Sequence, residues 1–154
     1  MTHFEVHPLG PGDLGRAAAI EASAPEAWDE EGLAGELAGT CGRLYGLWAG
    51  GRLCGVAVFQ KILDEASLLS LTVDPALRRR GWGEALLRAC LDRLAREGAR
   101  ICFLEARARN APAVTLYQKI GFQKVGIRRG FYRRPEDDAL LMRLEIGPEG
   151  FPLL

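Results

Sequence analysis

The chain has 154 residues, of which 48% are hydrophobic and 26% charged, and its 20 basic side chains are matched by 20 acidic ones. This length fits a single domain spanning residues 1–154, and a chain of this size can bury about 70% of its unfolded surface around one core. A formal charge of zero argues against direct nucleic-acid binding as the main role, because such binding needs a net basic surface.

The sequence contains neither a targeting pattern nor a metal motif. The first ten residues lack the basic region and apolar stretch of a signal peptide, and no run approaches about 18 apolar residues. We therefore expect a cytoplasmic protein with no membrane partner. The cysteines at positions 41, 54, 90 and 102 lack the paired spacing of a zinc site, so we expect no bound metal.

The N-terminal third predicts one strand and two helices. Residues 4–9 form a strand-like run that ends at a Gly-Pro-Gly segment. Asp13 has the side chain of an N-cap, which predicts a helix from there to about residue 23. Asp29 is placed in the same way to cap a second helix that runs toward residue 38.

A glycine pair in the middle of the chain predicts a hairpin. Gly50-Gly51 separates the apolar runs 44–48 and 53–59, and two glycines can adopt the positive φ angles that a tight turn requires. Apolar residues on both faces of the second run indicate a sheet that is covered on both sides. Simple alternation places Leu53, Ala57 and Phe59 on one face, and Cys54, Val56 and Val58 on the other.

The second half continues the alternation of strands and helices. Helical spacing of apolar residues, capping residues and glycine stops define its elements. They are a strand at 68–73, a helix at 84–97, a strand at 101–106, a helix between Asn110 and Gly121, and strands at 125–129 and 139–146.

An arginine- and glycine-rich loop stands between the strand at 68–73 and the helix that follows. Its sequence is Arg78-Arg79-Arg80-Gly81-Trp82-Gly83. At a strand-to-helix turn the first N–H groups of the helix lack internal partners, glycines let a ligand approach the main chain, and arginines add positive charge. The loop therefore has the features of a phosphate site, although such a short string also arises by chance.

From residue 68 to residue 144 the chain resembles the GNAT acyl-CoA-dependent N-acetyltransferases. Arg78-x-x-Gly81-x-Gly83 matches their coenzyme A pyrophosphate motif, and residues 71–75 match their fourth strand. Residues 104–110 and 116–122 are similar to the signature of the branch that acetylates the N-terminal alanine of a small-subunit ribosomal protein. The resemblance implies a mixed α/β fold, in which about four helices flank a mostly antiparallel central sheet of about seven strands.

The resemblance also implies which residues hold acetyl-CoA. In the family the fourth strand pairs with the pantetheine and acetyl portions, and the loop binds the pyrophosphate. Asn110 has two readings of equal weight, a helix cap alone or a cap that also contacts the cofactor. The implied cofactor-binding residues are Leu71, Thr72, Val73, Arg78, Arg79, Arg80, Gly81, Trp82, Gly83, Glu84 and Asn110.

Two side chains are implied to carry the chemistry. Glu105 is the general base, directly or through water, and its alternative reading is a strand-end carboxylate paired with Arg107 or Arg109. Tyr117 protonates the leaving thiolate, and its alternative reading is a core aromatic on the apolar stripe of its helix.

The acceptor side matches the branch less closely. Phe131-Tyr132 stands where the branch has a Tyr-Tyr pair, Ala106 where it has Val, and Ala27 where it has Pro; Tyr132 is the implied substrate-binding residue.

The acceptor itself is an amine, and chemistry favours an α-amine. Its usual pKa is about 7.8 against about 10.4 for lysine, so lysine costs about 3.5 kcal/mol more to deprotonate. The resulting hypothesis is direct acetyl transfer, in a ternary complex, to a protein N-terminus such as that of a ribosomal protein. The alternatives are a protein lysine, a small amine such as a polyamine or aminoglycoside, and a coenzyme A-binding sensor without turnover.

Overall fold

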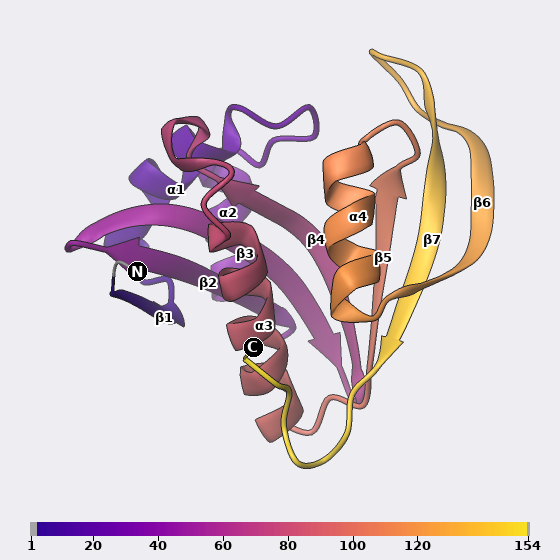
Figure 1. Cartoon of the computed structure of the whole chain (residues 1–154). Helices are drawn as coiled ribbons and strands as arrows, with labels where there is room; N and C mark the ends of the chain where they lie inside the picture. The colour runs from indigo at the N-terminus through magenta and orange to yellow at the C-terminus, as the bar shows by residue number, and fades with distance from the viewer. Residues whose placement is uncertain (1–2, 154) are drawn as a thin grey trace.

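A twisted sheet of seven strands runs through the computed structural model, which describes residues 3–153 (Figure 1). The strand order is β1-β2-β3-β4-β5-β7-β6, and every pair of neighbours is antiparallel except β4 and β5. The expected mixed α/β fold is thus confirmed. The elements are β1 (Phe4–Pro8), α1 (Leu14–Glu21), α2 (Glu30–Ala38), β2 (Gly42–Ala49), β3 (Arg52–Ile62), β4 (Glu65–Val73), α3 (Trp82–Arg96), β5 (Ile101–Arg107), α4 (Ala111–Ile120), β6 (Gln123–Tyr132) and β7 (Asp137–Glu145), with short 3-10 turns at Pro11–Asp13 and Pro75–Leu77.

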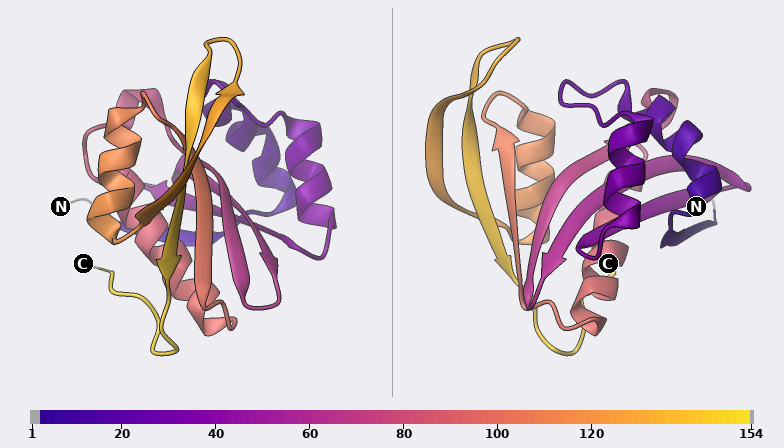
Figure 2. Two further views of the ribbon diagram at one scale, coloured as in Figure 1. Left: turned by 90° about the vertical axis from the view of Figure 1, so that its right-hand side faces the viewer. Right: turned by 180° about the vertical axis from the view of Figure 1, so that it is seen from behind.

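Helices cover both faces of the sheet (Figure 2). On one face α1 and α2 pack on β2 and β3, and their buried residues form one apolar cluster. On the other face α3 and α4 contribute to a larger cluster with the inner residues of β3, β5 and β7. None of the helices in residues 3–153 is both long and apolar enough to cross a membrane.

The predicted faces of β3 are wrong at its start because the strand contains a bulge. Leu47 of β2 pairs with Gly55, whereas the next residue, Trp48, pairs with Leu53, so that Cys54 is an extra residue on β3. An extra residue reverses the inward and outward alternation. Cys54 therefore joins Ala57 and Phe59 on the α3 face, and Leu53 joins Val56 and Val58 on the α1 and α2 face.

The predicted caps hold at two helices. Asp29 accepts a hydrogen bond from the Gly32 N–H at 2.7 Å, and Asn110 accepts one from the Ala113 N–H at 3.3 Å. Gly121, at φ 122°, ends α4 as expected. These caps fix where α2 and α4 begin, and α4 carries one of the candidate catalytic residues.

The predicted cap at Asp13 is wrong. The residue stands at the N-cap position of α1, but its carboxylate accepts a hydrogen bond from the preceding Gly10 N–H at 2.8 Å and makes none to the helix. A 3-10 turn at Pro11–Asp13 precedes the helix and directs the side chain backward.

The last hairpin is longer than the apolar runs predict. β6 extends from Gln123 to Tyr132, well beyond the predicted 125–129. It is an edge strand with mostly exposed side chains, so pairing with β7, and not hydrophobic burial, sets its length. Tyr132 consequently lies at the end of a strand, next to the site.

Candidate active site

The only parallel pair of strands in the described sheet opens into a wedge (Figure 1). β4 and β5 pair over their first residues, from Glu65 with Ile101 to Leu68 with Leu104, and then separate. Beyond that point β4 stays paired with β3 through Val73, and β5 with β7 through Arg107. Main-chain groups of β4 from residue 69 onward therefore face the opening, where an extended ligand can pair with them as another strand would.

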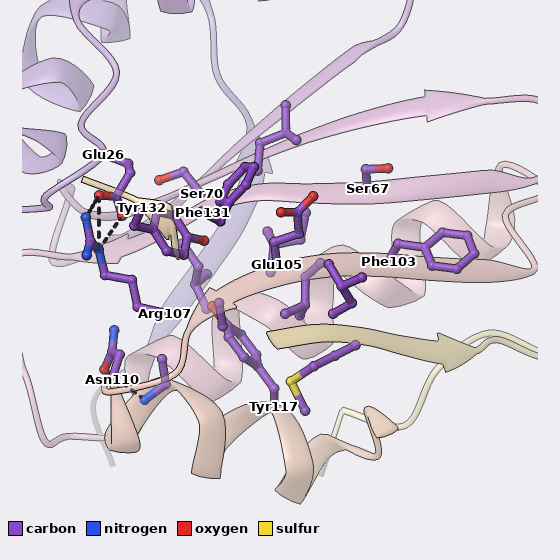
Figure 3. Close-up of a pocket in the computed structure, with 18 of the residues that line it drawn as sticks. Glu26, Ser67, Ser70, Phe103, Glu105, Arg107, Asn110, Tyr117, Phe131 and Tyr132 are labelled. Carbon is purple, nitrogen blue, oxygen red and sulfur yellow. Dashed lines mark hydrogen bonds and ion pairs between the residues drawn. The ribbon is translucent and has the colours of Figure 1, made fainter. Parts of the chain in front are cut away.

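A cavity of about 630 Å³ occupies this opening (Figure 3). Its walls come from β4, β5, α4, the β6–β7 hairpin and the segment between α1 and α2. Of the residues predicted to form the site, Leu71, Thr72, Glu105, Asn110, Tyr117 and Tyr132 line this one cavity.

Glu105 faces the cavity from the side of the sheet on which Phe103 also lies. Leu104 and Ala106 alternate with it and are buried in the α3 and α4 layer, so Glu105 points away from that layer. Its carboxylate lies 3.8 Å from the Arg128 guanidinium, and its side chain is 35% exposed. The alternative pairing of Glu105 with Arg107 or Arg109 is not found among the described residues, where Arg107 binds Glu26 and Glu105 lies near Arg128. The Glu105 carboxylate is thus accessible to a molecule in the cavity.

Tyr117 approaches the cavity from the opposite side, rising from α4 toward the end of β5 (Figure 3). Its ring is buried and packs edge-on against Phe122, with 5.9 Å between ring centroids. Burial, chiefly, raises the pKa of Tyr117 to about 12, so that the phenol keeps its proton at neutral pH. The two readings of Tyr117 are compatible, because it is both a core aromatic and a residue that reaches the cavity.

The loop between β4 and α3 has the backbone features of an anion site. Gly81 adopts φ 79°, a left-handed conformation that favours glycine, and α3 starts at the next residue. A Cβ at Gly83 would lie at ordinary contact distances, 3.7 Å from Leu116 and 3.8 Å from Val73. Gly83 therefore lies beside the end of β4. These residues fit a pyrophosphate group that continues from an acyl chain in the wedge.

Two side chains in this loop region are committed to the protein's own packing. The buried indole of Trp82 packs edge-on against Phe4 at 5.5 Å, and Glu84 binds Arg88 at 2.9 Å and Lys119 at 2.8 Å. These ion pairs lower the pKa of Glu84, the one with Lys119 having the largest effect, and the pair with Lys119 links α3 to α4. Trp82 and Glu84 accordingly offer a ligand their main-chain N–H groups and not their side chains.

The three arginines of the loop differ in their surroundings. Arg78 donates hydrogen bonds to the Ser23 hydroxyl at 2.9 Å and to the Val73 carbonyl at 3.3 Å. Arg79 and Arg80 are exposed, and Arg79 has a positive φ of 66°. Arg78 thus fastens the loop, and its two neighbours present charge to the surface. No group of three or more His, Cys, Asp or Glu side chains in residues 3–153 is arranged to hold a metal ion.

The structure also brings Arg107 to the cavity wall, a role that the sequence analysis did not assign. Its guanidinium binds the Glu26 carboxylate at 2.5 Å and lies 4.4 Å from the centroid of the Tyr132 ring. Arg107 belongs to the segment that carries the family resemblance. Glu26, however, lies 81 residues earlier in the chain, and no local pattern indicates that the two meet.

A second unpredicted feature is a buried carboxylate, Glu21, behind β4. It accepts hydrogen bonds from the Ser70 hydroxyl at 2.5 Å and from the Thr72 hydroxyl at 3.4 Å. Burial raises its pKa, although these hydrogen bonds oppose the shift. Glu21 therefore fastens the end of α1 to the strand that lines the cavity.

A sheet whose two parallel strands separate, with a helix that begins after a glycine beside the gap, is the arrangement of the acyltransferases of the N-acetyltransferase class. The acetyltransferase (GNAT) family model matches residues 16–122, more than half of the chain. The chain belongs to this family.

Relatives and solved structures agree with that assignment. The chain is 39% identical over 104 residues to the [ribosomal protein bS18]-alanine N-acetyltransferase of Escherichia coli, which covers 66% of this chain and 70% of that protein. It is 37% identical over 142 residues to the N-alpha-acetyltransferase RimI of Mycobacterium tuberculosis, with 88% of each chain covered.

The fold comparison gives the same result. A crystal structure of the E. coli ribosomal-protein-S18-alanine N-acetyltransferase superposes with a TM-score of 0.87 at 34% identity, covering 93% of this chain and 94% of that one. Arabidopsis thaliana NAA60, solved in complex with acetyl-CoA, shares the fold with a TM-score of 0.83 at 21% identity, over 94% of this chain and 99% of its own.

Proposed function

We propose that this chain transfers the acetyl group of acetyl-CoA to the N-terminal α-amine of a protein, and that its acceptor is a ribosomal protein that begins with alanine. The observation that carries the proposal is the placement of Glu105 and Tyr117 at one cavity from opposite faces of β5. The names of the E. coli and M. tuberculosis relatives support the acceptor class.

On the cofactor side, the free edge of β4 and the loop before α3 are the groups that would hold acetyl-CoA. Residues 71–73 offer main-chain groups to an extended chain, and the N–H groups at Gly81–Glu84 offer donors to the pyrophosphate. Arg79 and Arg80 add positive charge nearby. When bound, acetyl-CoA supplies the acetyl group as an activated thioester.

On the acceptor side, Glu105 accepts the proton that the α-amine must lose before it can attack. A carboxylate within reach of the amine, or one water away, serves as general base and contributes about 10²–10⁴-fold to the rate. Arg128, 3.8 Å away, lies on the exposed edge strand and can swing aside when a cationic amine approaches the carboxylate.

Tyr117 holds a proton at its hydroxyl on the other side of β5. The phenol is protonated at neutral pH, and burial raises its pKa further, to about 12. It can therefore donate a hydrogen bond to the thiolate as that group leaves on the cofactor side, and the proton that the thiolate takes from Tyr117 is restored to the phenol from solvent. Glu105 and Tyr117 therefore handle different protons, and neither needs to bond to the other.

The test offers competing amines to the purified protein together with isotopically labelled acetyl-CoA. The acceptors are an alanine-starting ribosomal peptide, the same peptide with a blocked N-terminus and an internal lysine, and a polyamine. We expect the label on the free α-amine alone. Label on lysine or on the polyamine would overturn the acceptor class, and coenzyme A binding without transfer to any amine would favour a sensor.

A second experiment identifies the natural acceptor. A ribosomal extract treated with the enzyme and labelled acetyl-CoA is digested, and its N-terminal peptides are sequenced by mass spectrometry. One labelled N-terminus that begins with alanine is the expected result. Label confined to other N-termini would replace the proposed acceptor with the protein that carries it.

A further inference from the structure

An arginine at the end of β5, with most of its side chain covered, joins three segments around the acceptor side of the cavity. Arg107 donates from Nε and Nη2 to the Glu26 carboxylate, which lies between α1 and α2, at 2.5–3.1 Å. It also donates to the Pro135 carbonyl at 2.6 Å and to the Arg133 carbonyl at 3.3 Å, both in the turn between β6 and β7. One side chain thus ties two surface segments to the central sheet.

The burial of Arg107 requires these partners. Its side chain is 9% exposed, whereas the Glu26 side chain is 49% exposed. A guanidinium removed from water is stable only where its N–H donors have acceptors. Here the planar guanidinium donates hydrogen bonds to one carboxylate and two carbonyls. Loss of Arg107 would therefore remove a contact from both segments at once.

Arg107 also fixes the aromatic wall of the site. Its guanidinium stacks on Tyr132 at 4.4 Å, and Tyr132 meets Phe131 edge-on at 5.1 Å. The pairing of β6 with β7 is interrupted between Arg128 and Tyr132 and resumes where Tyr132 pairs with Asp137. Arg107 adds a side-chain contact to this irregular end of the hairpin.

The segment between α1 and α2 depends on the same contact. Its start is held by the Ser23 hydroxyl, which accepts a hydrogen bond from Arg78 at 2.9 Å, and its middle by Glu26 on Arg107. Glu26, Arg107 and Tyr132 line the cavity together with Glu105 (Figure 3). Whatever enters from this side meets a wall whose shape Arg107 sets.

We propose that Arg107 is a positioning residue for the acceptor: through Glu26 and the carbonyls of the β6–β7 turn it holds both acceptor-side segments in place, so that the amine reaches Glu105. This inference rests on the proposed function for its acceptor. It assigns Arg107 no contact with the reacting atoms, and it leaves the cofactor side of the wedge independent of Arg107.

The test compares Arg107→Ala, Arg107→Lys and Glu26→Ala with Arg109→Ala as the matched control, because Arg109 is an exposed arginine just past the same strand. We expect Arg107→Ala to lower kcat/KM for the peptide by about tenfold to a hundredfold, mainly through KM, since misplacement of about 1 Å can cost a hundredfold. The affinity for acetyl-CoA should stay within about twofold. Arg107→Lys keeps the charge without the fork and should recover part of the loss.

Two further readouts make the proposal decisive. Glu26→Ala, on an exposed segment where misfolding is not at issue, should reproduce a large share of the Arg107→Ala effect, and the double variant should add little to it. Amide hydrogen exchange should rise in residues 22–29 and 131–136 of Arg107→Ala, and not in Arg109→Ala.

If hydrogen exchange in Arg107→Ala did not change in those segments, Arg107 would not hold the two segments together. If exchange rose but the peptide KM did not change, Arg107 would not position the acceptor. If Arg107→Ala weakened the binding of acetyl-CoA as much as that of the peptide, Arg107 would stabilise the whole protein and would not act on the acceptor side alone. A wild-type protein that acetylates no peptide would sink the proposed acceptor, whereas hydrogen exchange would still decide whether Arg107 couples the two segments.

Discussion

Glu105 and Tyr117 lie on opposite faces of β5, and both reach the cavity that opens where β4 and β5 part. The strand therefore separates the group that can accept a proton from the group that can donate one. An acceptor amine and an acyl donor can then approach from different sides and meet in the gap. This separation makes the effects of the two residues distinguishable by experiment.

Replacing Glu105 with Gln should impair transfer and spare cofactor binding. The amide keeps the size of the side chain but cannot take a proton from the amine, so kcat/KM for an alanine-starting peptide should fall by about 10²–10⁴-fold at neutral pH. Steady-state kinetics measures this loss, and calorimetry with coenzyme A should show the same affinity as the wild type. The matched control is Glu145→Gln, which changes an exposed carboxylate outside the cavity.

The deficit of Glu105→Gln should shrink as pH rises. An α-amine has a usual pKa of about 7.8, so above that pH much of the peptide is already neutral when it binds. The rate ratio of wild type to variant should therefore decrease from pH 6.5 to pH 9. A ratio that does not vary with pH would mean that Glu105 acts by another route than proton removal.

Tyr117→Phe should lower kcat and leave the peptide KM and the stability nearly unchanged. The ring would keep its packing against Phe122, and only the hydroxyl that reaches the cavity would be lost. Thermal unfolding should report a change within about 0.5 kcal/mol. Tyr45→Phe is the control, because that buried phenol bonds to Glu97, outside the active-site cavity, and its loss should leave turnover intact.

The pKa of Tyr117 gives this prediction a pH signature. A phenol loses its proton as pH rises through its pKa, and here that value is about 12. Tyr117 should therefore keep its proton throughout the range of an ordinary assay, and the wild type should show no loss of kcat from this group between pH 8 and pH 10. An alkaline loss that disappears in Tyr117→Phe would contradict the raised pKa of Tyr117, although it would still support a role for the phenol as proton donor.

Local signals account for most of the fold. The caps at Asp29 and Asn110, the glycine stop at Gly121 and the hairpin at Gly50-Gly51 were predictable, because each depends on the chemistry of a few neighbouring residues. The bulge at Cys54 was not predictable, since it depends on the register in which β3 pairs with the neighbouring strand β2. Alternation within one strand carries no information about an extra residue in a ladder.

The candidate site, too, was predictable only in part. Glu105 and Tyr117 were identified on a resemblance, and their placement at one cavity agrees with it. The pairs of Arg107 with Glu26 and of Glu105 with Arg128 join segments that are distant in sequence. Many carboxylates could satisfy an arginine, so such pairs follow only from the tertiary structure.

Gly81→Ala should weaken acetyl-CoA binding more than Gly83→Ala does. Alanine at φ 79° costs about 1–2 kcal/mol and would push the loop away from the conformation that starts α3, so the coenzyme A affinity should drop by about tenfold. Gly83 has no positive φ, and its added Cβ would lie 3.7 Å from Leu116, an ordinary contact. Gly83→Ala should thus fold with unchanged or slightly higher stability.

Calorimetry with coenzyme A and thermal unfolding separate the two glycines. The expected result is a lower melting temperature and a weaker affinity for Gly81→Ala, with an unchanged melting temperature and a smaller loss of affinity for Gly83→Ala. If both variants bind coenzyme A as the wild type does, the loop before α3 is not where the pyrophosphate docks.

Glu21 should make the stability of the protein fall as pH rises above the usual range of a glutamate. Burial raises its pKa above the usual 4.5, so the unfolded chain gives up this proton at a lower pH than the folded one does. Between those two pKa values the folded state binds more protons, and the free energy of unfolding therefore decreases with increasing pH. Glu21→Gln stays neutral, and its stability should lack this decrease.

Urea unfolding of both proteins between pH 4.5 and pH 8 measures the difference, because the contributions of the other titrating groups cancel in it. Glu21→Leu tests the hydrogen bonds separately: it leaves the Ser70 and Thr72 hydroxyls without their acceptor and should cost about 1–3 kcal/mol across the same pH range. Parallel stability curves for the wild type and Glu21→Gln would mean that the carboxylate ionises equally easily in both states, and the buried anchor behind β4 would then be held by its hydrogen bonds alone.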